Sequence, residues 1–268
     1  DDTWVVGWIL DDSEAVAVAR STDDGATWQD ETLLSAGAPL SDPAGVDLVA
    51  TSEGWFAVWS AVTAARGLGG DPDIFYARGD AAGTMWDPPA ALNSNAATDS
   101  GSDRRPSVAV GHDGALLVAW QTNDALHSYG TDNDVVYSTS NDGGATWQTP
   151  LLVHWYGRSD NVADGDDTRP KALARGDGSF VVMWQSTADP FEEGYTRSRI
   201  YQSTGEPPAI TWEGPVPVTT SVSADNMEMG NTDQSPVVVA SPNGTLFTLY
   251  TSKVDVFGSG GADTDLFG

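Results

Sequence analysis

Paired aspartates recur along this chain at one fixed spacing. Three pairs share the pattern D-x-D just before a short apolar run: Asp71 and Asp73, Asp132 and Asp134, and Asp263 and Asp265. Residues two apart on a strand point to the same side, so each pair can present two carboxylates to one hard cation such as Ca2+. Aspartate also caps turns and solvates loops. The pattern therefore predicts either turn-capping residues or calcium-binding loops.

Arginine is scarce in this sequence, and two of the arginines stand in the same dipeptide. Arg105-Pro106 and Arg169-Pro170 each open an apolar segment. Because arginine is scarce, these two equivalent residues are candidate ligand contacts. A structural pairing of each arginine with an aspartate of an adjacent loop accounts for the same pattern.

Aromatic residues form a third candidate group. Trp155 and Tyr156 lie in a long segment between two predicted strands. Their rings could form a platform on which sugars stack, because an aromatic face offers a large apolar area beside a polar edge. Packing of the long segment onto the strands below explains the same residues equally well.

The charge balance limits the partners of the chain. The sequence has 12 basic and 39 acidic residues, a formal net charge of -27, and it has no cysteine. Nucleic acid and anionic lipid would be repelled, whereas cations or basic surfaces would be attracted. An adaptation for solubility, for example in salty surroundings, gives the same balance. The sequence contains no apolar run long enough for a membrane span, so we expect no membrane insertion.

The elements that must position these side chains come from a repeat. An apolar run that closes on an aromatic residue recurs about every 60 residues, ending at Trp8, Trp59, Trp120, Trp184 and Tyr250. Each unit contains short alternating runs separated by turn residues, which is typical of four antiparallel strands. The predicted units are approximately 1–34, 35–92, 93–153, 154–218 and 219–268, of which the first and last are incomplete.

A second repeated motif lies at the turn between two strands of a unit. Ser21 to Trp28 and Ser140 to Trp147 both read S-x-D-x-G-x-T-W. The Asp can accept hydrogen bonds from its own turn, the Gly supplies a positive φ, and the Trp anchors the returning strand. The residues expected to build the two turns are Ser21, Asp23, Gly25 and Trp28, and Ser140, Asp142, Gly144 and Trp147.

This octet resembles the Asp-box, also called the BNR repeat, of the sialidase (neuraminidase) superfamily. In that family the Asp-box is a structural turn between the third and fourth strands of a blade. The resemblance implies an all-β β-propeller of four-stranded antiparallel blades, with about six blades in the full protein and about four to five represented here. Sialidases hold the substrate carboxylate with three arginines, the first in an R-I-P motif. Arg105 and Arg169 lack the middle residue of that motif.

The long segments between strands fall on one rim of the predicted propeller, and that rim is acidic. We therefore expect a non-catalytic, extracellular or cell-surface recognition or scaffold propeller that binds a glycan, a cation or a protein through these long loops. Its candidate ligand contacts are Arg105, Arg169, Trp155 and Tyr156, with Ca2+ as the candidate cofactor and no catalytic residue assigned. Two alternatives stay open: an exo-sialidase-type glycoside hydrolase with part of its active site outside this segment, and a structural subunit of a larger surface assembly.

Overall fold

The described part of the chain is built from antiparallel strands and turns. The computed structural model describes residues 3–10, 15–29, 31–35, 40–63, 68, 70–124, 132–154, 165–188, 198–206, 211–218, 234–241, 245–252 and 265–267. Among these residues there is no helix, and so no helix that could cross a membrane.

Five sheets follow one another along the chain. The first contains β1 (Trp4–Leu10), β2 (Ala15–Ser21) and β3 (Thr32–Leu33). The second contains β4 (Ser41–Thr51), β5 (Gly54–Val62), β6 (Asp73–Gly79) and β7 (Ala90–Ala91). The third contains β8 (Asp103–Val110), β9 (Leu116–Thr122), β10 (Asp134–Ser140) and β11 (Leu151–Leu152).

The last two sheets repeat this pattern. The fourth contains β12 (Asp167–Ala174), β13 (Phe180–Ser186), β14 (Arg199–Glu206), β15 (Thr211–Trp212) and β16 (Val216–Pro217), and both short strands pair with β14. The fifth contains β17 (Gln234–Ala240), β18 (Leu246–Ser252) and β19 (Asp265–Phe267). Each sheet is a simple antiparallel meander, as expected for a propeller blade.

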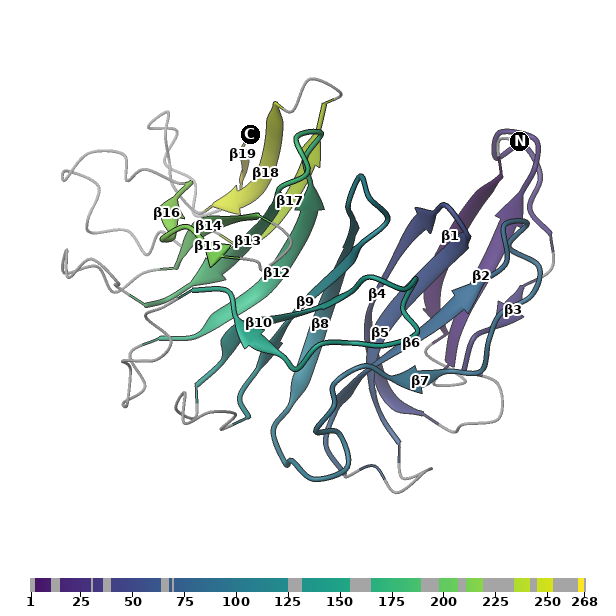
Figure 1. The fold of residues 1–268 in the computed structure, drawn as a ribbon, viewed down its shortest axis with the longest axis horizontal. Coiled ribbons are helices and arrows are strands. Elements are labelled where there is room, and N and C mark those ends of the chain that lie inside the picture. Colours follow the sequence, from purple (N-terminus) through teal and green to yellow (C-terminus); the bar gives the residue numbers. More distant parts are fainter. Residues whose placement is uncertain are drawn as a thin grey trace.

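The sheets stand in a row in chain order, with the first and last sheets on opposite sides of the molecule (Figure 1). The first strands of neighbouring sheets are in contact: β4 with β8, β8 with β12, and β12 with β17. These strands therefore line the inner edge of the array. The predicted all-β fold with four-stranded antiparallel blades is confirmed, and the described sheets form an open arc.

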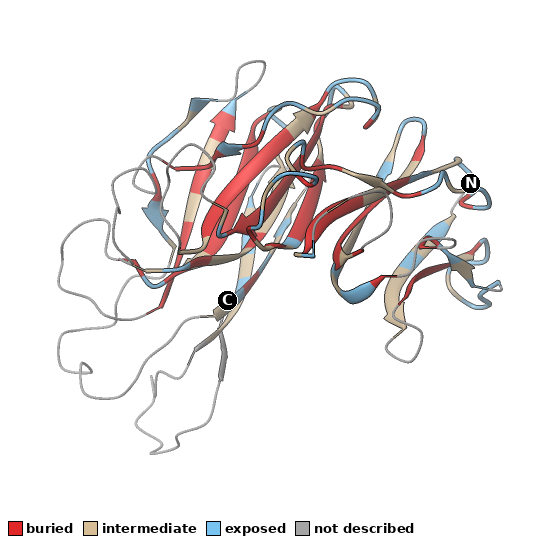
Figure 2. Ribbon diagram, turned by 90° about the horizontal axis from the view of Figure 1, so that it is seen from below, coloured by how far each residue is buried: buried red, intermediate tan, exposed pale blue. Residues whose placement is uncertain are grey.

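The hydrophobic core lies between neighbouring sheets. One cluster joins the first two sheets, a second joins the second and third, and a third joins the third and fourth. The second strand of each middle sheet carries a fully buried tryptophan at the same place: Trp59, Trp120 and Trp184. Figure 2 shows the buried residues gathered in the middle sheets and the exposed ones at the turns. Blade-to-blade packing of repeated apolar faces is thus the main source of stability.

The two S-x-D-x-G-x-T-W turns have the same hydrogen bonds. In the second turn, Asp142 Oδ1 accepts from the Thr146 amide at 2.9 Å and from Ser140 Oγ at 2.7 Å, and Asp142 Oδ2 accepts from Thr146 Oγ1 at 2.6 Å. Asp23 makes the same three contacts with Thr27 and Ser21. These bonds hold the pKa of Asp23 down at about 2. The turn is closed by a charged carboxylate, as the residue types indicate.

The two turn glycines offer a test of how the blades pack. Gly25 and Gly144 have the same conformation, with φ of 82° and 83°. A Cβ on Gly144 would lie 2.6 Å from Phe56 of the neighbouring sheet, whereas a Cβ on Gly25 would meet nothing closer than 3.7 Å.

We predict that Gly144→Ala destabilises the protein by about 1–3 kcal/mol more than Gly25→Ala. Both variants place alanine at the same positive φ, so the difference isolates the clash with Phe56. Urea unfolding followed by tryptophan fluorescence measures it. Equal losses in the two variants would show that the third sheet does not pack on Phe56 in this way.

Candidate functional site

A bulge at the inner edge places the two predicted arginines. The pairing of β8 with β9 shifts between Arg104 and Ser107, and the pairing of β12 with β13 shifts between Thr168 and Lys171. Arg105 and Arg169 occupy these bulges with φ of 55° and 56°. Gly45 and Ser235 hold the corresponding places in β4 and β17, with φ of 63° and 54°. A positive φ is costly for a large side chain, and strained backbone positions of this kind cluster at functional sites.

The three arginines at this edge differ in their partners. Arg104 forms an ion pair with Asp42 of the neighbouring sheet at 2.6 Å. Arg169 Nη1 donates to Ser235 Oγ at 2.8 Å and to Gln185 Oε1 at 3.2 Å, both of them uncharged. Arg105 has no hydrogen bond or ion pair to any residue within the described ranges. Two positive charges therefore lack a carboxylate partner in this part of the structure.

The pKa of Arg105 reflects its partial burial and the other arginines close to it. Partial burial and the nearby charges of Arg169 and Arg104 lower the pKa of its guanidinium from the usual value. Like charges held close together are unfavourable unless an anion lies between them. The arrangement is suited to binding a carboxylate or another small anion.

Two glutamine side chains hold Arg169, and the sequence analysis missed both. Gln121 Oε1 accepts from the Arg169 amide at 3.1 Å, and Gln185 Oε1 accepts from the Arg169 guanidinium. Each of these glutamines directly follows a buried tryptophan, Trp120 or Trp184. The repeated W-Q dipeptide was a readable signal for residues at this edge.

A cluster of carboxylates lies at the same rim, beside the start of β8. Asp71, Asp73 and Asp99 each offer one oxygen, and these oxygens all lie within 4.8 Å of one another. Asp103, the first residue of β8, is linked to Asp73 through Asn93, whose amide donates to both. The prediction brought Asp71 and Asp73 together but missed Asp99, which comes from the loop between sheets.

Burial shifts the pKa values of this cluster upward. Desolvation is the largest cause for all three affected groups, and repulsion between neighbouring carboxylates adds to it. The pKa is raised to about 6 for Asp73, about 7 for Asp99 and about 8 for Asp103.

The third sheet has a related cluster, in which a histidine takes the place of the asparagine. Asp134, His154 and Asp167 are all buried and lie close enough to share an ion. His154 Nε2 lies 2.7 Å from Asp167 Oδ2, and its ring stacks on Trp184 at 5.1 Å. His154 takes the place of Asn93, because each lies two residues after the fourth strand of its sheet. Here an imidazole of the chain itself pairs with a carboxylate.

The remaining predicted residues are placed as follows. Asp132 precedes Asp134, but the cluster in that sheet forms from Asp134, His154 and Asp167 without it. Asp265 begins β19, opposite Ser252 of β18. Trp155, Tyr156 and Asp263 lie outside the described residues.

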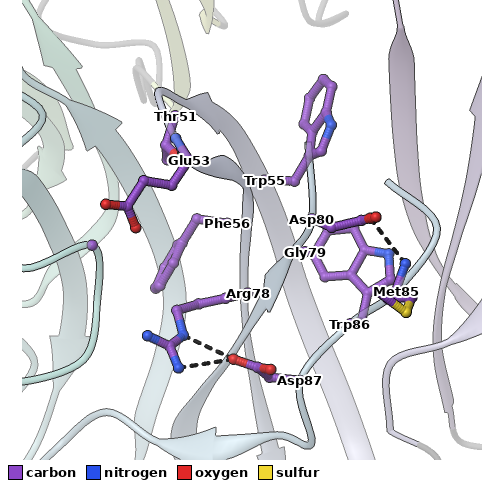
Figure 3. Close-up of a pocket in the computed structure, with 11 residues that line it drawn as sticks. Thr51, Glu53, Trp55, Phe56, Arg78, Gly79, Asp80, Met85, Trp86 and Asp87 are labelled. Carbon is purple, nitrogen blue, oxygen red and sulfur yellow. Dashed lines mark hydrogen bonds and ion pairs between the residues drawn. The ribbon is translucent and has the colours of Figure 1, made fainter. Parts of the chain in front are cut away.

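A hollow of about 480 Å³ lies on the opposite rim, among the hairpin turns (Figure 3). Trp55, Met85 and Trp86 line it together with an exposed ion pair of Arg78 and Asp87 at 2.8 Å. None of the predicted ligand or metal residues contributes to it. The charged groups at the inner edge, rather than this hollow, form the candidate site.

Solved structures with a similar fold include glycoside hydrolases. No family model and no curated protein matches the sequence. A Dyadobacter fermentans protein of unknown function superposes with a TM-score of 0.61 at 13% identity, over 91% of this chain and 66% of that one. The Penicillium chrysogenum α-L-arabinanase complexed with arabinobiose gives 0.59 at 14% identity, over 96% and 76%. The Hadza microbial sialidase Hz136 gives 0.53 at 14% identity, over 90% and 50%.

These neighbours support the propeller fold and correct one prediction. The expected non-catalytic recognition or scaffold module is wrong as the leading interpretation, because the neighbours with a named activity are glycoside hydrolases. The prediction gave weight to the acidity of the whole long-loop rim. Charges more than about 10 Å away are largely screened, so the local arginines decide which ligand charge this edge favours.

We predict that, in EDTA, the melting temperature falls as the pH is raised from about 5 to 8. The carboxyls of Asp73, Asp99 and Asp103 titrate near 3.8 when unfolded and at about 6 to 8 when folded. The folded state therefore binds more protons in this window, and raising the pH destabilises it. Differential scanning fluorimetry across the window measures the slope.

Asp99→Asn should flatten this slope, because it removes one titrating group and its repulsion on Asp103. Asp113→Asn, at an exposed turn on the opposite rim, is the control for loss of one negative charge. A wild-type melting temperature that rises with pH would contradict the burial of these carboxylates.

Proposed function

We propose that this chain is part of a glycoside hydrolase whose substrate is a sugar bearing a carboxylate, such as a sialoside or a uronoside. The observation that carries the proposal is the pair Arg105 and Arg169, held at equivalent bulges of adjacent inner strands without a carboxylate partner among the described residues. Bidentate contacts from guanidinium groups recognise a carboxylate in charge and in shape.

The setting of Arg169 supports this assignment. Its contacts with Gln185 and Ser235 fix the direction of the guanidinium without cancelling its charge. A preorganised donor loses little entropy when a ligand arrives. Arg104 differs, because Asp42 already neutralises it, and we assign it a structural role. Arg105 and Arg169 are assigned to substrate binding, and bond cleavage is assigned to no described residue.

The fold of the neighbours supports the enzyme class. Arabinanases, arabinofuranosidases and a sialidase share this arrangement of sheets. The arginine pair favours the sialidase type, since the arabinobiose bound in two of those structures carries no charge. The two S-x-D-x-G-x-T-W turns favour the same type, as Asp-boxes, and we propose an extracellular or cell-surface location with it. The chain spans 66% of the first similar structure, so the activity is proposed for the protein as a whole.

We predict that the full-length protein hydrolyses a fluorogenic sialoside or glucuronide, and that Arg105→Ala with Arg169→Ala lowers kcat/KM at least about a hundredfold. Each charge-assisted contact is worth about 1.5–3 kcal/mol, and the double variant removes two of them. Initial rates on both acidic substrates and on a neutral arabinofuranoside measure this.

Arg78→Ala is the matched control, because it removes an exposed arginine on the opposite rim and should leave the rates unchanged. Turnover of the arabinofuranoside alone would reject the carboxylate and favour an arabinan-type substrate. Folded full-length protein that cleaves none of the three would reject the proposal.

A further inference from the structure

The loops above the second and third sheets bring three carboxylates together without a positive charge. Asp71 and Asp73 come from the segment that enters β6, and Asp99 comes from the segment between β7 and β8. One oxygen of each lies within 4.8 Å of the other two. No lysine, arginine or histidine of the described ranges forms an ion pair with them. We propose that Asp71, Asp73 and Asp99 bind a calcium ion that joins these two loops.

The hydrogen bonds of Asp73 point independently to a ligand. This side chain is fully buried, at 0% exposure. Its Oδ1 accepts from Asn93 at 2.9 Å, but its Oδ2 is a buried atom with no partner. An unsatisfied buried carboxylate oxygen is costly, and native structures almost always satisfy such atoms. One carboxylate oxygen of Asp73 lies within 4.8 Å of an oxygen of Asp71 and of Asp99, and a cation among these oxygens would relieve their repulsion.

The neighbouring polar atoms repeat this arrangement. Asn95 donates to Asp99 Oδ2 at 2.6 Å and to Asp124 Oδ2 at 2.8 Å. The other oxygen of Asp99, one oxygen of Asp71 and the side-chain Oδ1 of Asn95 are buried without a donor. The amides of Asn93 and Asn95 thus satisfy one oxygen of Asp73 and one of Asp99, and the second oxygen of each has no donor. All of the unsatisfied atoms are of the same chemical kind.

This donor set suits calcium. Calcium binds six to eight oxygens from carboxylates and carbonyls in flexible geometry, whereas magnesium requires a compact octahedron and retains its waters. Sulfur is absent, and the cluster contains no imidazole, which disfavours zinc and copper. The related cluster in the third sheet differs, because it has the imidazole of His154 in place of Asn93.

Occupation of the site would fix the loop that leads into β8. The amide of Asp103 donates to the Pro72 carbonyl at 2.8 Å, so the loop carrying Asp71 and the start of β8 are already in contact. Arg105 follows Asp103 by two residues. A bound ion would therefore hold the strand that presents Arg105, without contact between the ion and that arginine.

Calcium titration of the EDTA-stripped full-length protein tests the proposal by calorimetry. We expect calcium at about a hundredfold excess over Kd to raise Tm by roughly 5 to 10 °C. Asp99→Asn and Asp71→Asn should each weaken calcium binding at least about tenfold or remove one ion per chain. Asparagine keeps an oxygen for the hydrogen bond from Asn95, and near-UV circular dichroism checks that each variant is folded.

Asp113→Asn is the control for general attraction of calcium to an acidic surface, and it should bind as the wild type does. An equal loss in this control would overturn the site, as would wild-type binding in both loop variants. Absence of any calcium effect on the folded wild type would overturn it directly. Magnesium alone that gave the same shift in Tm at the same concentration would reject the assignment to calcium. None of these readouts depends on hydrolase activity.

Discussion

A buried carboxylate at the start of an inner strand ties that strand to the one beside it. Asp103 Oδ1 accepts from Trp120 Nε1 at 3.0 Å, and Asp167 Oδ1 accepts from Trp184 Nε1 at 3.2 Å. A carboxylate with almost no exposure is tolerated only where such bonds satisfy it. The bond sets where the strand begins, and the bulge with its arginine follows two residues later. The position of the guanidinium groups thus depends on an indole in the core.

A series of hydrogen bonds also joins the inner strands of three neighbouring sheets. Asp47 Oδ2 accepts from Ser107 Oγ at 2.9 Å, and Ser107 Oγ accepts from the Ala172 amide at 3.1 Å. These contacts cross from β4 to β8 and from β8 to β12. The edge that carries Arg105 and Arg169 therefore rests on strands joined by direct hydrogen bonds as well as by apolar packing. Such a base keeps the distance between two arginines on different blades nearly constant.

The sequence predicted what repeats and missed what depends on contact between loops. Buried tryptophans, turn octets and the R-P dipeptides recur at regular spacing, so their equivalence could be read without a structure. The aspartate two residues before each R-P was also readable, as D-x-R-P at Asp103 and Asp167. Asp99 has no such signal. Its approach to Asp71 is set by the path of an irregular loop, and local pattern does not encode that path.

Asn93 and His154 occupy the same place in successive blades, each beside two buried aspartates. A fold built from repeats has the same position once in every blade. A substitution in one blade leaves the packing of the other blades in place. The residue at this one position therefore decides whether an imidazole or an amide faces the two buried carboxyl groups of a blade. Divergence among blades, rather than the invention of a new loop, is a short evolutionary route to a new site in such a protein.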